Sequence, residues 1–357
     1  MSVDRILVVK LSDIGDVLTA TPALRALRQS FPTARLEVLL PPHSAPILED
    51  SPLVDKLIIF DKFRYDRLSE ALRPKNLAAM FRLGLELRRR RYDHLILLHH
   101  LTTRWGALKF AALALASGAR ERIGLDNGRG WFLTEGVEDK GFGYKHEVEY
   151  ALEVVGRLGA ETPDKRLEIT ISLTDEGRAR EKLCLLEEQG RLLVAIHPGT
   201  GGHLPARRWP PARFARVAES LAKRHGAKIV LVGKAGDDVA EVEAQMEAEV
   251  LNLAGQTTLK ELAAVLKRCA LFIGADSGVM HLAAATGVPV VALFGPTNPA
   301  AWGPWGTDSV VVRAGLPCSP CSYVNFRLSK GCPTRECMDA ITPEMVLEAA
   351  RSLNPAW

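Results

Sequence analysis

The sequence predicts an α/β protein made of two doubly wound, Rossmann-like domains. Its 357 residues exceed one typical domain. In both halves, short β-branched runs alternate with helical stretches, which indicates parallel sheets covered by helices on both faces. Three glycine-containing segments directly follow strands, where open α/β sheets bind ligands. We therefore expect domains at residues 1–165 and 166–340, followed by a terminal helix in 341–357.

The first half contains four runs that indicate buried strands. They are Ile6–Val9, Leu36–Leu40, Leu57–Phe60 and His94–Leu98. Helical patterns cover Pro22–Gln29, Asn76–Arg89 and Arg104–Ala116. The stretch 118–145 is rich in glycine and charge and is expected to form loops. A helix from His146 to about Leu158 then leads into polar residues 159–165, where we expect the interdomain connection to begin.

The second half repeats this rhythm. Its predicted strands are Leu192–Ile196, Ile229–Val232, Leu271–Ile273 and Val290–Leu293. Its predicted helices are Pro211–His225, Asp237–Glu247 and Thr258–Lys267, and Pro343–Leu353 forms a last helix that could pack on either domain. The carboxyl ends of the two sheets are expected to face each other across a cleft.

The composition indicates a soluble globular protein. Apolar residues make up 47% of the chain and charged residues 25%, and neither a signal peptide nor a membrane-spanning stretch is evident, so we expect a cytoplasmic protein. The net charge of +4 is too small to indicate nucleic acid, but it suits an anionic substrate or a membrane surface. Four arginines, 88–91, either close a helix, where cations favour the dipole, or contact lipid phosphates.

The first candidate site segment is Lys10–Val17, a strand end followed by a tight loop before the helix that Thr21-Pro22 is expected to open. Gly15 allows close backbone approach, and Asp16 falls where the strand's carboxyl end meets the cleft. The alternative is that Asp16 only favours the amino terminus of the next helix. Spacing does not distinguish the two.

The second segment, 197–202, reads His-Pro-Gly-Thr-Gly-Gly and is followed by Arg207-Arg208-Trp209. A glycine-rich turn exposes backbone N–H groups, and a guanidinium matches phosphate oxygens, so together they could hold a diphosphate. The alternative is an ordinary loop with solvated arginines. The segment matches neither a Walker A nor a Gly-x-Gly-x-x-Gly pattern, which disfavours standard P-loop and dinucleotide enzymes.

The third segment, Gly274–His281, again follows a strand and starts a helix rich in small residues. Asp276 or Ser277 can cap that helix, which leaves N–H groups from Gly278 onward for an anion. His281 lies one turn into the helix. It is either a packed core residue or a ligand contact.

These segments, in this order, resemble glycosyltransferase family 9, the heptosyltransferases of the lipopolysaccharide inner core. The resemblance covers nearly the whole chain and rests on the series Ser-x-x-Gly-Asp-Val, His-Pro-Gly-Thr, Arg-Trp-Pro and Asp-Ser-Gly-x-x-His. It implies the GT-B fold, an amino-terminal acceptor-binding domain and a carboxyl-terminal nucleotide-sugar-binding domain. The implied reaction transfers heptose from ADP-heptose to Kdo or heptose on a lipid-linked acceptor.

The resemblance also implies roles for single residues. Asp16 is the general base, which suits direct displacement with inversion. Lys10, Ser12 and Gly15 match the acceptor side. The donor positions comprise phosphate contacts, the heptose-orienting acid Asp276 and the adenosine-side Thr257, and the full set is Thr200, Arg207, Thr257, Asp276, Ser277, Gly278 and His281.

No cofactor is expected. The sequence lacks the Asp-x-Asp pair with which many glycosyltransferases bring a metal to a diphosphate, so arginine and helix amino termini are expected to stabilise the leaving group. The spacing of Cys318, Cys321, Cys332 and Cys337 allows structural zinc, free thiols or loop packing, and a reducing cytoplasm disfavours disulfides.

A monomer at the inner-membrane surface, with no nucleic-acid partner, is the expected state. The alternatives are a family 9 enzyme with another donor sugar or glycan acceptor, and a nucleotide-sugar-binding protein without transferase activity.

Overall fold

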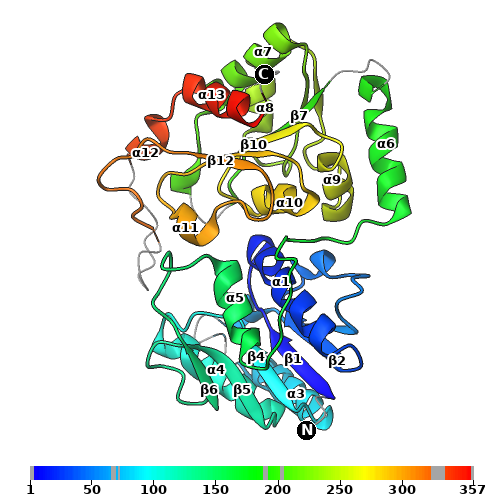
Figure 1. Cartoon of the computed structure of the whole chain (residues 1–357), viewed down its shortest axis with the longest axis vertical. Coiled ribbons are helices and arrows are strands. Elements are labelled where there is room, and N and C mark those ends of the chain that lie inside the picture. Colours follow the sequence, from blue (N-terminus) through cyan, green and yellow to red (C-terminus); the bar gives the residue numbers. More distant parts are fainter. Residues whose placement is uncertain are drawn as a thin grey trace. The chain divides into compact units, whose positions relative to one another are not determined.

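The computed structural model describes residues 4–65, 70, 73–187, 192–201, 205–322 and 334–354. The chain divides into two compact units. Unit 1 comprises Met1–Gly141 and Glu147–Lys165, and unit 2 comprises Phe142–His146 and Arg166–Trp357 (Figure 1). Each unit is an α/β layer structure around a parallel sheet, as the alternation of strand and helix patterns predicts.

The described part of unit 1 contains a six-stranded parallel sheet in the order β3-β2-β1-β4-β5-β6. Its strands are β1 (Arg5–Val9), β2 (Arg35–Leu40), β3 (Lys56–Ile59), β4 (His94–Leu97), β5 (Glu121–Asp126) and β6 (Glu135–Glu138). In β1, Leu7 pairs with Glu37 of β2 on one side and Leu95 of β4 on the other. The strand order reverses beside β1, so its carboxyl end opens at the switch point of the sheet.

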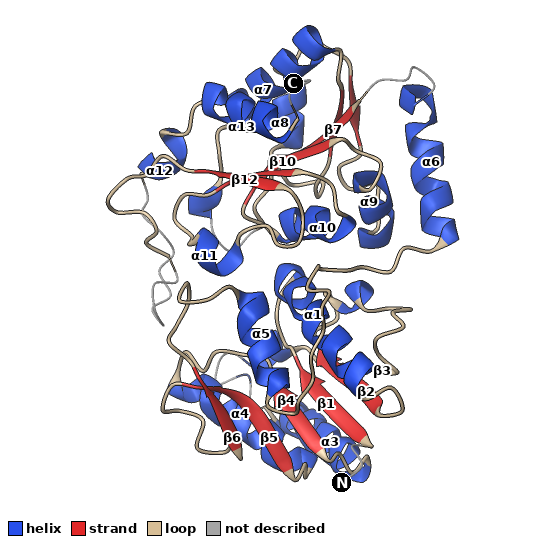
Figure 2. Cartoon of the chain, in the orientation of Figure 1, coloured by secondary structure: helices blue, strands red, loops and turns tan. Residues whose placement is uncertain are grey.

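Helices cover both faces of this sheet (Figure 2). On one face, α1 (Ile14–Ser30) packs against α5 (Glu147–Gly156). On the other, α3 (Pro74–Arg89) packs against α4 (Arg104–Ser117), and a core that includes Leu87, Ala107 and Ala111 separates them from the strands. Two short 3-10 turns, η1 (Ala45–Ile47) and η2 (Lys62–Tyr65), complete the described elements of this unit.

The prediction that residues 118–145 form only loops was wrong, because β5 and β6 lie there. In β6, the edge strand, only Val137 is buried. A strand that buries one residue in four gives almost no hydrophobic pattern, since the sheet rather than the local sequence holds it in place.

Helix α1 begins at Ile14, eight residues before the predicted start at Pro22. Proline usually marks a first turn because it cannot donate a helical hydrogen bond. Here Pro22 lies inside the helix, and the side-chain hydroxyl of Thr21 donates to the Leu18 carbonyl at 2.7 Å. In a regular helix the N–H of residue 22 would donate to the Leu18 carbonyl, but proline has no N–H. The Thr21 hydroxyl therefore satisfies that carbonyl instead.

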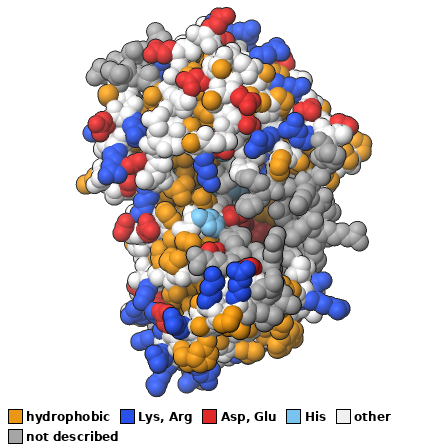
Figure 3. Space-filling model, turned by 180° about the vertical axis from the view of Figure 1, so that it is seen from behind, with side chains coloured by type: hydrophobic (Ala, Val, Ile, Leu, Met, Phe, Trp, Pro, Cys, Tyr) orange, Lys and Arg blue, Asp and Glu red, His pale blue; other side chains and the backbone are white. Residues whose placement is uncertain are grey.

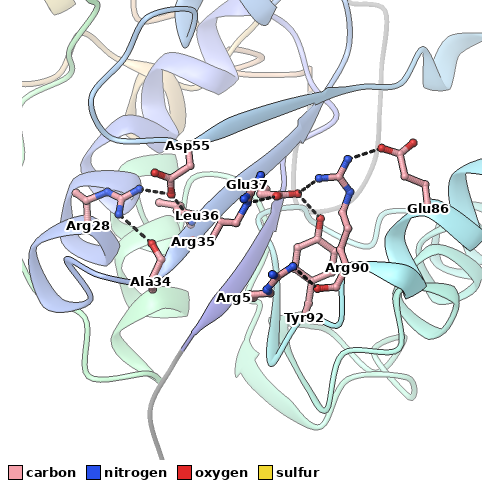
Figure 4. A network of polar contacts seen from close by, with 10 residues as sticks. All are labelled: Arg5, Arg28, Ala34, Arg35, Leu36, Glu37, Asp55, Glu86, Arg90 and Tyr92. Atoms are coloured by element: carbon pink, nitrogen blue, oxygen red, sulfur yellow. Dashed lines mark hydrogen bonds and ion pairs between the residues drawn. The ribbon is translucent and has the colours of Figure 1, made fainter.

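A buried polar network ties β2 to the chain after α3 (Figure 4). Glu37 is 1% exposed and accepts hydrogen bonds from Arg35 Nε at 2.7 Å, Arg90 Nη1 at 2.7 Å and Tyr92 Oη at 2.6 Å. Although burial opposes it, these donors hold the pKa of Glu37 below its usual value. Arg90, which also pairs with Glu86, therefore has a structural partner, unlike a solvated member of an arginine run.

The described part of unit 2 also contains a six-stranded parallel sheet, in the order β12-β11-β10-β7-β8-β9. Its strands are β7 (Leu193–His197), β8 (Lys228–Leu231), β9 (Val250–Asn252), β10 (Leu271–Ala275), β11 (Val290–Leu293) and β12 (Ser309–Val312). The first strand in sequence, β7, pairs with both β8 and β10. The switch point of this sheet therefore lies between β7 and β10.

In Figure 2, α7, α8 and α13 lie on one face of this sheet, and α9 and α10 lie on the other. The helices are α6 (Leu173–Glu187), α7 (Pro211–His225), α8 (Val239–Glu243), α9 (Leu259–Leu266), α10 (Gly278–Thr286), α11 (Pro299–Trp302), α12 (Glu336–Asp339) and α13 (Pro343–Leu353), with a 3-10 turn η3 (Pro205–Arg207). The strands β9 and β12 and the helix α6 were not predicted, and α8 is shorter than the predicted helix 237–247.

Trp209 anchors one face of unit 2. It is fully buried, packs edge-on against Phe214 with 4.8 Å between ring centroids, and donates from Nε1 to the Ile341 carbonyl at 3.0 Å. Because Ile341 lies two residues before the start of α13, this contact and the packing of α13 on α7 and β12 place the terminal helix in unit 2.

The segment Phe142–His146 belongs to unit 2 although unit 1 surrounds it in sequence. Phe142 packs on Trp302, and His146 stacks on Trp305 with 4.5 Å between ring centroids and lies 3.0 Å from the Gly303 carbonyl through Nε2.

In the part of the chain that the structure describes, no helix is long and apolar enough to cross a membrane.

Candidate active site

In unit 1, the segment after β1 is held by His99, which follows β4. The Leu11 N–H donates to His99 Nε2 at 2.7 Å, and Ser12 Oγ lies 3.5 Å from Nδ1. Burial, together with Lys62 and Lys10, lowers the pKa of His99 well below 6.5, so the ring is neutral at physiological pH. Since Nε2 accepts the hydrogen bond from the Leu11 N–H, the ring's own hydrogen sits on Nδ1, and the ring fixes Leu11 and Ser12 as a rigid support.

A second contact fixes the same segment from the β2 side. Ser44, which is fully buried, donates from Oγ to the Ser12 carbonyl at 3.1 Å. His43 Nε2 lies 3.0 Å from the Asp13 carboxylate, which makes no side-chain cap to α1. Asp13 is therefore engaged with His43.

Asp16 lies in the first turn of α1, so the predicted loop position is corrected to a helical one. This first turn adjoins the carboxyl end of the sheet, and its N–H groups favour a carboxylate, so the position agrees with both alternatives and the role of Asp16 stays a prediction. The half-buried carboxylate forms no hydrogen bond with the described residues. Burial raises its pKa, Glu147 and Asp13 raise it further, and Lys10 and Lys62 oppose them. An unpaired carboxylate with enhanced proton affinity suits general-base chemistry.

The predicted acceptor-side residues surround Asp16 in sequence and differ in what they do. Lys10 is 6% exposed, and its ammonium group is close enough to lower the pKa of Asp16. Ser12 is buried and contacts His99 and Ser44. Gly15 is a buried residue of the first helical turn. Their contact with an acceptor remains a prediction.

A buried charge cluster that the sequence analysis missed lies beside this segment. His100 Nδ1 is 2.8 Å from Asp139 Oδ1, and Nε2 is 3.0 Å from Glu147 Oε1. Burial would lower the pKa of His100, but Glu147 and Asp139 raise it to about 9. The ring therefore carries a positive charge at neutral pH and donates from both nitrogens. The sequence did contain a signal for this cluster, because the pair His99-His100 directly follows a predicted strand.

In unit 2, the second and third sequence segments meet at the switch point. His197, the last residue of β7, lies between Ser277 Oγ at 3.3 Å and Asp237 Oδ2 at 3.4 Å. Ser277 is the N-cap of α10 and accepts the Met280 N–H. Because that oxygen accepts, its hydroxyl can donate to His197 Nδ1, and the Nε2 proton then faces Asp237.

Asp237 explains why two loops of this site require glycine. A Cβ at Gly199 would collide with the Asp237 carboxylate, and a Cβ at Gly233, where φ is +149°, would lie 2.7 Å from Asp237 Oδ2. Although burial opposes it, hydrogen bonds from His197 and the Lys234 N–H lower the pKa of Asp237. Asp237 was predicted as a helix residue, and instead it precedes α8 and supports the His197 loop.

Arg207 and Asp276, both predicted as donor-binding residues, form an ion pair. Arg207 Nη1 donates to Asp276 Oδ2 at 3.1 Å, and both side chains are largely buried. Arg207 Nε is buried and has no hydrogen-bond partner among the described residues. Of the two candidate caps, Ser277 caps α10 while Asp276 binds Arg207. The Gly278 N–H, in the first turn of α10, is a ready anion donor.

The remaining predicted donor residues occupy different surroundings. Thr200 is 3% exposed, and its hydroxyl lies near the Gly201 carbonyl at 3.4 Å. His281 is 4% exposed within α10, so it is packed in the helix layer. Thr257 follows β9 at the sheet edge, next to the Thr258 cap of α9, and forms no hydrogen bond with the Arg207–Asp276 pair.

Thr297 was not predicted as a site residue. It follows β11 at the same carboxyl edge, is 2% exposed, and its hydroxyl has no partner among the described residues. A buried unpaired hydroxyl beside a ligand-binding edge is available to a ligand. The sequence Gly295-Pro296-Thr297, directly after a predicted strand, was the signal.

The cysteine prediction is only partly within the described residues, because Cys332 lies outside them. Cys318 is exposed, Cys321 is partly exposed, and Cys337 is buried in the unit 2 core beside Met338. Among the described residues, no three side chains of metal-binding type form a cluster. The zinc alternative remains a prediction.

Comparison with known proteins identifies the family of the chain that carries these two half-sites. The family model for glycosyltransferase family 9 (heptosyltransferase) matches residues 80–330. The chain belongs to glycosyltransferase family 9. Lipopolysaccharide heptosyltransferase 3 of Escherichia coli is 30% identical to it over 311 residues, which cover 84% of this chain and 86% of the relative. Lipooligosaccharide heptosyltransferase 2 of Campylobacter jejuni is 27% identical over 350 residues, 95% of each chain.

Solved structures of family 9 agree along the whole chain. A family 9 glycosyltransferase from Veillonella parvula has a TM-score of 0.77 at 27% identity and covers 99% of this chain, which in turn covers 98% of it. The E. coli ADP-heptose lipopolysaccharide heptosyltransferase II has a TM-score of 0.74 at 26% identity, with 98% of each chain covered. The predicted family and GT-B fold class are thus confirmed, and the protein is a glycosyltransferase with lipopolysaccharide heptosyltransferases among its relatives.

Proposed function

We propose that this family 9 enzyme transfers heptose from ADP-heptose to a Kdo or heptose residue of the lipopolysaccharide inner core, with inversion at the anomeric carbon. The observation that carries the proposal is Asp16, a half-buried carboxylate of raised pKa at the switch point of unit 1 that forms no hydrogen bond with the residues the structure describes. The E. coli and C. jejuni relatives support the donor and the glycan, because they are lipopolysaccharide and lipooligosaccharide heptosyltransferases and one of them is an ADP-heptose enzyme.

In the proposed step, the Asp16 carboxylate takes the proton of the acceptor hydroxyl as that oxygen attacks the anomeric carbon. The new glycosidic C–O bond forms while the bond from that carbon to the donor's diphosphate oxygen breaks, and ADP leaves with the electron pair. A base of enhanced proton affinity is more effective at this transfer, provided that it is ionised when the acceptor arrives.

Unit 2 supplies the groups that stabilise the leaving diphosphate. The Arg207 guanidinium keeps unused donors beside its pair with Asp276, and the Gly278 N–H lies at the amino terminus of α10. A fixed guanidinium and a helix amino terminus stabilise developing phosphate charge without reorganising when the bond breaks. We assign the donor phosphates to these groups, the heptose to Asp276 and the adenosine side to Thr257.

The test is transfer with purified protein. ADP-heptose, and for comparison UDP- and GDP-sugars, are incubated with truncated core acceptors, and products are identified by mass spectrometry. Asp16→Ala should lose activity by on the order of 100- to 10,000-fold, the usual contribution of a general base. Glu121→Gln, which alters an exposed carboxylate of unit 1 that His94 engages, is the matched control.

Equal consumption of ADP-heptose by wild type and Asp16→Ala would refute the assignment. Faster turnover of another sugar nucleotide would show that the enzyme uses a different donor from the one proposed. Mass spectrometry of lipopolysaccharide from a strain that lacks the protein would then show at which sugar the core stops. Because the proposed acceptor is lipid-linked, we also infer that the enzyme works at the cytoplasmic surface of the inner membrane.

A further inference from the structure

The outer side of the α3–α4 layer in unit 1 exposes apolar side chains in a regular pattern. On α3, Leu77, Phe81 and Leu85 are 46%, 68% and 40% exposed. Their spacing of four residues places them along one side of the helix. A stripe of three large apolar side chains, one of them a phenylalanine, is unusual on a helix that faces only water.

Helix α4 adds a second exposed apolar stripe. Leu108 and Leu115 are 51% and 46% exposed, and Ala112 between them is exposed as well. The two helices pack closely, since a Cβ at Gly84 of α3 would lie 3.4 Å from the Ala116 Cβ of α4. The stripes are therefore parts of one helical layer, hereafter the α3–α4 surface.

The charges on this layer have nearly one sign. The two helices contain Lys75, Arg82, Arg88, Arg89, Arg104 and Lys109, whereas Glu86 is their one acidic residue and pairs with Arg90. The resulting charge of +5 exceeds the +4 of the whole chain. Arg82, Arg88 and Arg89 form no ion pair with the described residues. Figure 3 shows apolar side chains among Lys and Arg side chains on this back side of unit 1.

We propose that the α3–α4 surface docks on the anionic phospholipid surface of a membrane. Apolar side chains that insert at the headgroup boundary, flanked by lysine and arginine, are the pattern of an interfacial amphipathic helix. Charge decides between the possible occupants: two copies of a layer whose helices carry a formal charge of +5 repel each other, whereas anionic headgroups attract the layer. The proposed function supplies the reason for such docking, a lipid-linked acceptor, but the docking itself rests on this surface.

Flotation of the full chain with vesicles tests the proposal. At low salt, the protein should float with vesicles of phosphatidylcholine and phosphatidylglycerol but not with phosphatidylcholine alone, and added salt should weaken binding. The triple variant Arg82→Gln/Arg88→Gln/Arg89→Gln should bind roughly 100-fold more weakly, since each basic residue contributes about a factor of five near an anionic surface.

A second triple variant, Leu77→Ser/Phe81→Ser/Leu85→Ser, tests insertion. It should lower vesicle affinity by on the order of tenfold or more, because burial of each side chain contributes at least a factor of several. The matched control is Leu173→Ser/Arg180→Gln on α6, where Leu173 is 87% exposed and unit 2 carries both residues. The control should bind like wild type, and all variants should keep the wild-type circular dichroism spectrum.

Transfer to a lipid-free acceptor separates docking from catalysis. The surface variants should match wild type on that acceptor and lose activity only on acceptor embedded in anionic vesicles. Vesicle binding that is unchanged in both triple variants would overturn the proposal, as would loss of a dimer in these variants without any vesicle binding. Wild-type binding to anionic vesicles in a protein that transfers no heptose would refute the proposed function and leave the docking surface intact.

Discussion

His100 lies between two buried carboxylates, and its replacement by glutamine should remove a pH-dependent part of the stability of unit 1. The His100 side chain is 5% exposed, and the Asp139 and Glu147 side chains are 0% and 7% exposed. At neutral pH the imidazolium donates to both. Glutamine leaves two buried carboxylates without a cation, which is costly because an uncompensated charge cannot be solvated there.

The magnitude follows from the pKa of His100, which the two carboxylates raise from 6.5 to about 9. One unit of pKa corresponds to 1.36 kcal/mol, so the protonated ring stabilises the folded state by about 3 kcal/mol. Because the folded-state pKa is the higher one, this stabilisation is complete below about pH 6.5 and is lost as the pH rises through about 9.

Urea unfolding at about pH 6 and about pH 9.5 measures this difference. The gap in free energy of unfolding between wild type and His100→Gln should shrink by about 3 kcal/mol at the higher pH. Hydrogen exchange should locate the loss in unit 1, near β4 and α5. Ile59→Ala, which alters an exposed and uncharged position of the same unit, should show no such pH dependence. A gap that stays constant across this range would refute the reasoning.

Three further results are expected. Glu147→Gln removes a charge that raises the pKa of Asp16, so the acidic limb of the pH profile of kcat/KM should move to lower pH, and an unmoved limb would contradict the coupling. Asp16→Asn should raise the melting temperature at neutral pH and lose that gain below about pH 3.8, because a raised pKa means that the ionised carboxylate destabilises the folded state. Gly199→Ala should cost about 1–3 kcal/mol through collision with Asp237, measured by urea unfolding, whereas Gly177→Ala on α6, with open space around it, should be neutral or stabilising by up to about 1 kcal/mol.

The fold class and the two half-sites were predictable from local sequence. Buried parallel strands such as β1, β7 and β10 are continuous apolar runs, and a glycine-containing loop after each marks the carboxyl edge where ligands bind. The sequence did not place every residue of these loops correctly. It put Asp16 in a loop rather than in the first turn of α1, and it left the cap of α10 open between Asp276 and Ser277.

Other features depend on residues far apart in the chain. Arg207 and Asp276 are separated by 69 positions, and His100 and Glu147 by 47, so no spacing pattern in the sequence predicts either pair. The edge strand β6 carries too few buried residues to form a pattern, and only pairing with β5 makes it a strand.

By itself, the sequence determined two doubly wound sheets and the loops proposed to carry the chemistry, because apolar periodicity and glycine act locally. Only the tertiary structure decided how the charges of those loops are shared. Asp13 is engaged by His43, Asp276 is paired with Arg207, and Asp16 forms no hydrogen bond within the described part of the chain. The reason is physical: the ionisation of a carboxylate depends on its burial and on charges within a few ångströms, and folding alone sets both.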